Sequence, residues 1–196
     1  MLYIKIYLIL LYYSIIKPKT IDKISMVHAI KSHMSSNNKY DKNKPYYYHL
    51  KMAVDIGKRF LFLIPIEDRN DVIGGIWEHD TIEDVSFVNY NDIKNKVNIH
   101  VAELAFACTN EKGKTRKERA NDKYYNGIKN TKYATFIKLC DRIANVSYSL
   151  KNKNKSFYFK YKNEHDNFKK KLCNNKFDLI DYEIMWSYLD NIFKNN

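Results

Sequence analysis

Residues 79–84, His-Asp-Thr-Ile-Glu-Asp, concentrate side chains that can bind a metal ion or move a proton. His79 and Asp80 offer one nitrogen and one oxygen ligand, a pair that suits a divalent ion such as Mn, Fe or Zn. If a helix continues through this segment, His79 shares a face with Glu83, and Asp80 shares a face with Asp84, because each pair is four residues apart. An isolated His-Asp pair is also typical of a charged helix end, so the other ligands must come from elsewhere in the chain.

Two expected helices can bring a third ligand to this pair. A buried helical stripe precedes the segment and places His79 and Asp80 at the carboxyl end of a helix; it consists of Val72, Ile73, Ile76 and Trp77. An earlier helix is expected over residues 46–57, between Pro45 and Pro65, and His49 lies at its beginning. If these two helices form an antiparallel hairpin, His49 comes within reach of His79 and Asp80.

A carboxylate inside a later apolar helix is the candidate for the fourth ligand. The apolar residues of that helix are Tyr133, Phe136, Ile137, Leu139 and Cys140. Asp141 follows them directly, and a buried carboxylate is costly unless it is paired or holds a metal. Its neighbour Arg142 points about 100° away on a helix and does not easily pair with it. Asn145 shares the face of Asp141.

The length of the chain indicates one domain, and its cysteine content indicates that the thiols are reduced. A chain of 196 residues can bury roughly 70% of its unfolded surface without help from a metal or a disulfide. The cysteines are odd in number and widely spaced, at Cys108, Cys140 and Cys173. That pattern favours free thiols and a cytoplasmic location.

The net charge of +12 suits anionic partners but does not indicate a specific nucleic-acid reader. Only five of the 34 basic residues are Arg, the residue that reads bases in a bidentate manner. We therefore expect no specific nucleic-acid binding. A basic helical protein that binds nucleic acid and keeps a metal only for structure remains the alternative from another functional class.

The two ends of the chain are assigned from their apolar patterns. Residues 1–16 are almost wholly apolar, but a membrane span needs about 20 residues and this run is shorter. Residues 1–19 are therefore interpreted as an appendage to the domain, and contact with a membrane is not favoured. The domain proper is then residues 20–196, and its remaining helices are expected at 20–34, 91–97, 101–108, 157–168 and 179–193. Asp178 is the expected cap of the last helix, and His28 and His33 are interpreted as surface or packing residues of the first rather than ligands.

Residues 109–121 form a polar and basic stretch that has two interpretations. Its cations are Lys112, Lys114, Arg116, Lys117 and Arg119. The stretch is either a solvated face or a loop that supplies cations to the phosphates of a substrate.

The order His49, His79-Asp80, Asp141 resembles the HD superfamily of metal-dependent phosphohydrolases, in which these positions bind one divalent ion inside a helical bundle. Residues 45–49, 79–84 and 138–145 look like the hydrolase domain of RelA/SpoT proteins and their small stand-alone relatives. Those enzymes remove pyrophosphate from guanosine tetra- and pentaphosphate. The resemblance covers about residues 20–150 and implies an all-α HD-domain helical bundle.

The resemblance also implies roles for individual residues. It makes His49, His79, Asp80 and Asp141 the ligands of one divalent ion, with Mn ahead of Fe or Zn. Glu83 and Asp84 would then orient the attacking water and move its proton.

Substrate contacts follow in the same way. The resemblance implies that Asn145 hydrogen-bonds the sugar or a phosphate oxygen. The family holds its nucleotide with an Arg and a Lys in the loop before the first histidine, where this chain offers Lys39, Lys42 and Lys44 and no Arg. The candidates for contact with the distal phosphates are Lys112 and Arg116.

The sequence thus predicts a metal-dependent phosphohydrolase for a small-molecule nucleotide, with guanosine tetra- or pentaphosphate as the first candidate substrate. Another nucleotide, or a phosphorylated dinucleotide, is the alternative that keeps the same metal site. The oligomeric state is left open by the sequence.

Overall fold

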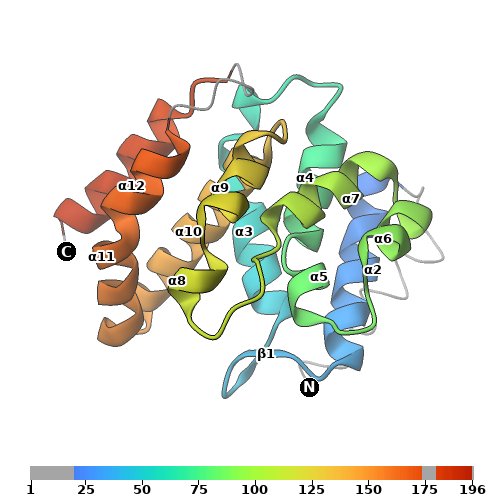
Figure 1. The fold of residues 1–196 in the computed structure, drawn as a ribbon, viewed down its shortest axis with the longest axis horizontal. Coiled ribbons are helices and arrows are strands. Elements are labelled where there is room, and N and C mark those ends of the chain that lie inside the picture. The colour runs from blue at the N-terminus through green and yellow to red at the C-terminus, as the bar shows by residue number, and fades with distance from the viewer. Residues whose placement is uncertain (1–19, 174–179, 196) are drawn as a thin grey trace.

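The computed structural model describes residues 20–173 and 180–195, and helices dominate this part of the chain (Figure 1). The all-α expectation is confirmed. The only sheet within the described residues is a hairpin of β1 (Lys39–Asp41) and β2 (Lys44–Pro45), which lies in the stretch expected as a polar loop. No helix of the described part is both long enough and apolar enough to cross a bilayer.

The expected helices are present in order, with ends that differ by a few residues from the predicted ones, whereas two of the helices given below, α8 and α9, were not predicted. The first half contains α2 (Ile21–Ser35), α3 (Tyr47–Arg59), the 3-10 turn η1 (Leu61–Leu63), α4 (Arg69–Glu78), α5 (Thr81–Asp84), α6 (Tyr90–Lys96) and α7 (Ile99–Cys108). The second half contains α8 (Arg116–Arg119), α9 (Asp122–Lys129), α10 (Ala134–Lys151), α11 (Lys155–Leu172) and α12 (Glu183–Lys194). The expected cap Asp178, the start of the last predicted helix at Leu179 and the expected appendage at 1–19 lie outside the described residues.

Helix α10 is the centre of the bundle, since it packs against α3, α4, α7, α9, α11 and α12. Twelve of its 18 residues are buried, as its apolar pattern predicts. A smaller apolar cluster holds α6 and α7 together beneath α5; it contains Val85, Val88, Ile93, Val101, Ala102 and Ala105. Helix α4, which His79 follows, therefore lies between two packed groups of side chains.

Two glycines let α4 approach its neighbours closely. A Cβ on Gly75 would stand 2.7 Å from Ile137 Cδ1 and 2.8 Å from Leu104 Cδ1, both well inside contact distance. A Cβ on Gly74 would stand 2.7 Å from Ser25 Oγ on the other side. Helix α4 is thus held between α2, α7 and α10, and this packing fixes the position of its carboxyl end.

The helix expected to continue through residues 79–84 is interrupted. Helix α4 ends at Glu78 with His79 as its C-cap, and Asp80 (φ −107°, ψ −2°) begins the separate short helix α5. The predicted common arc of His79 and Glu83 therefore does not form. The break turns Glu83 and Asp84 towards solvent while His79 stays buried.

Helix α2 also buries a different face from the one expected. Apolar residues at helical spacing, which would be expected to face the core, are Ile24, Val27, Ile30 and Met34. Of these only Ile30 is fully buried, and the other three are half-buried. Mostly small and polar residues face the core instead: Ser25, Ala29, Ser32 and His33. Since α2 lies against α4 at Gly74, small side chains on that face permit the close contact.

The close packing at Gly75 can be tested with one methyl group. We expect Gly75→Ala to lower the free energy of unfolding by about 1–3 kcal/mol, because the methyl collides with Ile137 and Leu104. Gly127, in the exposed part of α9, has open space where a Cβ would stand, with no neighbouring atom within 4 Å, so Gly127→Ala should raise stability by about 0.5–1 kcal/mol. Urea unfolding of both variants measures the difference, and equal stability of the two would contradict the packing described for α4.

Candidate metal centre and pocket

Four side chains from two helices and one helix junction meet at the centre of the bundle. His49 comes from the first turn of α3, His79 and Asp80 from the break between α4 and α5, and Asp141 from α10. One ligand atom from each of the four lies within 4.8 Å of those of all the others. His49 Nε2 is 3.3 Å from His79 Nε2, from Asp80 Oδ2 and from Asp141 Oδ1.

The spacing and the chemistry of this cluster fit one divalent ion. Ligands about 2.1 Å from a common ion stand about 3.0–3.4 Å apart in octahedral or tetrahedral geometry. His79 Nε2 lies 3.0 Å from Asp80 Oδ2 and 3.7 Å from Asp141 Oδ1, close to that range. A single N–H on His49 cannot satisfy three neighbours at equal distance, whereas a shared cation can.

The histidine rings are oriented unequally by their surroundings. His79 Nδ1 lies 2.8 Å from the carbonyl oxygen of Ile76, to which it can donate, and this contact leaves Nε2 free as a ligand. His49 Nδ1 is buried and has no hydrogen-bond partner in the described part of the chain. The His49 ring is instead held by stacking on Tyr40, with ring centres 5.0 Å apart.

Each carboxylate of the cluster is held by further polar groups. The Tyr46 hydroxyl donates to Asp80 Oδ2 at 2.7 Å. Lys138 Nζ lies 2.9 Å from Asp141 Oδ2, and Asn145 Nδ2 donates to Asp141 Oδ1 at 2.5 Å. These contacts fix both carboxylates in the direction of the two imidazoles.

Asn145, expected as a substrate contact, has both ends of its amide engaged within the protein. Its Nδ2 binds Asp141, and its Oδ1 accepts a hydrogen bond of 2.8 Å from the Tyr40 hydroxyl. In this arrangement Asn145 connects the β1 hairpin to the cluster and positions Asp141.

In the cluster, the negative charges of the two carboxylates and the positive charges of the imidazoles and Lys138 stabilise one another. Burial raises the pKa of Asp80 and of Asp141, but the imidazoles, and Lys138 beside Asp141, outweigh it and hold both pKa values well below the ordinary value. Burial lowers the pKa of His79, yet the two carboxylates raise it to about 10. The carboxylates are therefore charged, as metal ligands must be.

Glu83 and Asp84 lie beside the cluster at the rim of the pocket. The Glu83 carboxylate is exposed and accepts hydrogen bonds of 2.8 Å from the side-chain amide of Asn110. The pKa of Asp84 is raised to about 6, because one side of the carboxyl is covered by protein and the charge of Asp80 is nearby. Both side chains line the same cavity as His49, Asp80 and Asp141.

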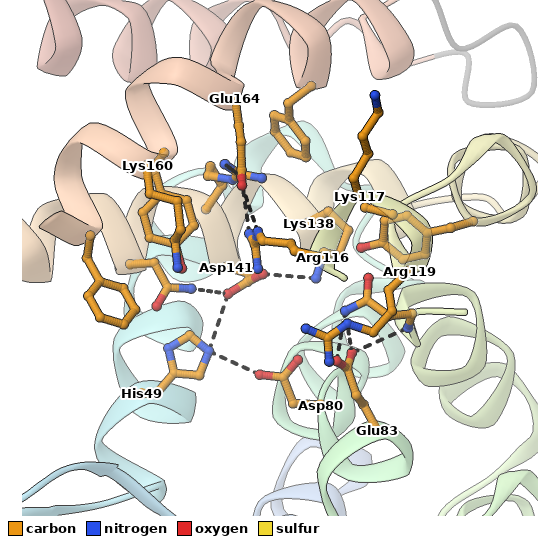
Figure 2. Close-up of a pocket in the computed structure, with 18 of the residues that line it drawn as sticks. His49, Asp80, Glu83, Arg116, Lys117, Arg119, Lys138, Asp141, Lys160 and Glu164 are labelled. Atoms are coloured by element: carbon orange, nitrogen blue, oxygen red, sulfur yellow. Dashed lines mark hydrogen bonds and ion pairs between the residues drawn. The ribbon is translucent and has the colours of Figure 1, made fainter. Parts of the chain in front are cut away.

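That cavity has a volume of about 690 Å³ and opens between α5, α8, α10 and α11. Figure 2 shows His49, Asp80 and Asp141 on one side and Arg116, Lys160 and Glu164 on the other. Of the expected substrate contacts, Asn145 and Arg116 line the cavity. Lys39 and Lys112 do not, because the cavity side of their segments is formed by Tyr40 and by Arg116, Lys117 and Arg119.

Several residues that line the cavity were missed by the sequence reasoning. Tyr40 lies in the stretch expected as a loop, and Lys160 and Glu164 lie in α11, beyond the motif-bearing residues 20–150. The half-apolar, half-charged pattern of α11 was the available signal. Helix α11 buries Tyr158, Tyr161 and Phe168 and contributes Lys160 and Glu164 to the cavity lining.

Comparisons with known proteins bear on the fold. No protein-family model matches the chain, and no curated protein does either. Among solved structures, it is similar to a metazoan ortholog of SpoT, described as hydrolysing ppGpp and playing a role in starvation responses. The similarity covers 91% of this chain and 97% of that chain, with a TM-score of 0.65 and 20% identity. The expected HD-domain helical bundle is thereby confirmed as the fold.

The cluster makes a prediction about bound metal. We expect Asp80→Ala and Asp141→Ala each to lower metal affinity by at least about 10- to 100-fold, because each removes a charged ligand from a set of four. Metal content after loading with Mn, measured by mass spectrometry, checks this. Asp55→Ala is the control, since Asp55 pairs with Lys51 on the exposed face of α3. Unchanged metal content in the Asp80 and Asp141 variants would exclude these carboxylates as ligands.

Proposed function

We propose that this chain is a metal-dependent phosphohydrolase that acts on a nucleotide. The observation that supports the proposal is the convergence of two imidazoles and two carboxylates within 4.8 Å of one another, three of which, His49, Asp80 and Asp141, line a cavity of about 690 Å³. Such a donor set suits Mn, Fe or Zn, and Mn is our first candidate by the resemblance to HD phosphohydrolases. When bound, the ion would supply an acidified water and polarise a phosphoryl oxygen.

The protein groups have separate tasks in this proposal. His49, His79, Asp80 and Asp141 hold the ion. Lys138, Asn145 and Tyr46 keep the two carboxylates in place through the contacts described above.

Glu83 and Asp84 handle the proton of the attacking water. They line the cavity next to Asp80 without belonging to the four-residue cluster. In hydrolysis the water oxygen bonds to phosphorus as the phosphoester bond breaks, and the leaving oxygen receives a proton. A carboxylate at the rim can accept the proton of the water and pass it on.

Guanosine tetraphosphate is the first candidate substrate. Two lines support it: the motifs resemble the RelA/SpoT hydrolase domain, and the structurally similar metazoan protein is described as hydrolysing ppGpp. The cavity lining also includes aromatic rings, of which Phe157 and Tyr40 are not buried and offer surface on which a base can stack. Another nucleotide or a phosphorylated dinucleotide would use the same metal site.

The experiment that tests the function is turnover of a nucleotide panel by the purified, Mn-loaded chain. The panel contains guanosine tetraphosphate, ordinary nucleoside phosphates and phosphorylated dinucleotides, and products are separated by ion-exchange chromatography. We expect guanosine tetraphosphate to be cleaved with release of pyrophosphate. Cleavage of a different nucleotide of the panel would identify that nucleotide as the substrate in place of guanosine tetraphosphate. No turnover, together with tight, salt-dependent binding of nucleic acid, would support the non-catalytic alternative.

The role of the rim carboxylates separates catalysis from a structural metal site. Glu83→Gln and Asp84→Asn should keep the ion bound but lower kcat by roughly 100-fold or more, the usual contribution of general acid and base groups. Glu103→Gln, on the exposed face of α7, is the matched control and should retain full activity. Metal content and turnover are measured on the same preparations. Full turnover in both amide variants would remove Glu83 and Asp84 from the mechanism.

A further inference from the structure

One carboxylate, Glu164 of α11, bridges two guanidinium groups at the outer side of the cavity. Arg116 Nε donates to Glu164 Oε1 at 2.7 Å, and Arg116 Nη2 donates to Oε2 at 3.2 Å. Arg142 Nη1 donates to the same Oε2 at 3.0 Å. A planar anion held by three N–H groups from two arginines is the arrangement in which proteins also hold phosphate.

The cations around Glu164 exceed what one carboxylate can neutralise. Helices α8 and α11, with Arg142 of α10, line their part of the cavity with Arg116, Lys117, Arg119, Arg142 and Lys160. Glu164 is the only acidic residue that α8 and α11 contribute to the described cavity lining. Figure 2 shows Arg116 and Lys160 pointing into the space beside Glu164. This part of the cavity therefore carries a surplus of positive charge.

Lys160 has no carboxylate within 4.0 Å among residues 20–173 and 180–195. Its ammonium group lies over the rings of Phe157 and Tyr161, 4.0 Å and 4.7 Å from their centres. Burial lowers the pKa of Lys160, and the nearby charges of Arg116 and Arg142 lower it further. An anion beside Lys160 would relieve this repulsion.

The cationic group is separate from the four-residue cluster, although both line one cavity. Arg116 and Arg142 form their ion pairs with Glu164, and Asp141 forms its own with Lys138 and the histidines. A ligand that uses both places must carry more than one anionic group. Nucleotides with phosphates at two positions have this property.

We infer that Arg116, Arg142 and Lys160 form a second anion subsite, in which the Glu164 carboxylate is an internal counter-ion that a phosphate or pyrophosphate group of the ligand displaces. This inference rests on the proposed function for its nucleotide, but the subsite itself requires only a phosphate-bearing anion. The subsite favours highly charged ligands, because the incoming anion must displace the Glu164 carboxylate, which is already bound to both arginines. A dianionic or more highly charged group gains Lys160 as well, whereas a single negative charge only replaces Glu164.

Binding of inorganic pyrophosphate to the full-length chain, dialysed free of divalent ions, tests the subsite by isothermal titration calorimetry. We expect Glu164→Gln to tighten binding by about tenfold, because a neutral amide no longer competes for the arginines. Asp166→Asn is the matched control: it removes the same charge from an exposed position of α11 that does not line the cavity. Weaker or unchanged binding in Glu164→Gln, relative to Asp166→Asn, would overturn the displacement.

A second pair of variants tests the subsite without touching the Arg–Glu contacts. Lys160→Met should weaken pyrophosphate binding by at least about tenfold, since it removes the cation that has no carboxylate partner. Lys162→Met is its control on the same helix, because Lys162 donates to the carbonyl oxygen of Phe193 away from the cavity. Equal affinities for these two variants would show that Lys160 does not bind the anion.

The outcomes distinguish this inference from the proposed function. If pyrophosphate binds as expected in all four variants while no nucleotide is hydrolysed, the subsite holds and the catalytic proposal fails. If a nucleotide is hydrolysed but KM does not change in Glu164→Gln or Lys160→Met, the catalytic proposal holds and the subsite is wrong.

Discussion

The architecture depends on the enclosure of two carboxylates and two imidazoles whose ligand atoms lie within 4.8 Å of one another. Removing one member of such a buried charged group leaves another uncompensated, at a typical cost of about 3–5 kcal/mol. The bundle limits this cost by bringing the four side chains from different helices to one point, His49 from α3 and Asp141 from α10 among them. The close approach of α4 at Gly74 and Gly75 and the break after Glu78 both serve that convergence.

The residues around the cluster stabilise its charged side chains by ion pairs and hydrogen bonds. Lys138 is itself buried and offsets one charge of Asp141, while Asn145 and Tyr40 connect that carboxylate to the β1 hairpin. Tyr46 binds Asp80 and stacks on His33, with ring centres 4.3 Å apart. Burial lowers the pKa of His33 to about 4, so this ring stays neutral beside the charged cluster. Positive charge then increases toward α8 and α11, where a polyanionic ligand would enter.

The sequence predicted the parts of this structure that follow from apolar period and residue type. The helices, and the approach of His49 to His79 and Asp80, could be inferred because each motif lies beside a regular apolar stripe. The buried face of α2 could not, since α2 packs through Ser25 against Gly74 of α4, a contact that no hydrophobic pattern marks.

Contacts between residues far apart in the sequence could not be predicted from the motifs either. The contribution of Tyr40 depends on a two-stranded hairpin that turns its ring onto His49. Glu164 reaches Arg116 and Arg142 only because α11 folds back along α10 and next to α8. Lys39 was selected for its charge and its place in the loop before His49, and Lys112 for its charge, but their neighbours line the cavity instead.

The most direct test of the central claim is an anomalous difference map from crystals of the full-length chain soaked in Mn. The account predicts one peak, about 2.0–2.3 Å from His49 Nε2, His79 Nε2 and a carboxylate oxygen each of Asp80 and Asp141. A map with no peak among these four side chains, or with the peak at another group of residues, would contradict the account.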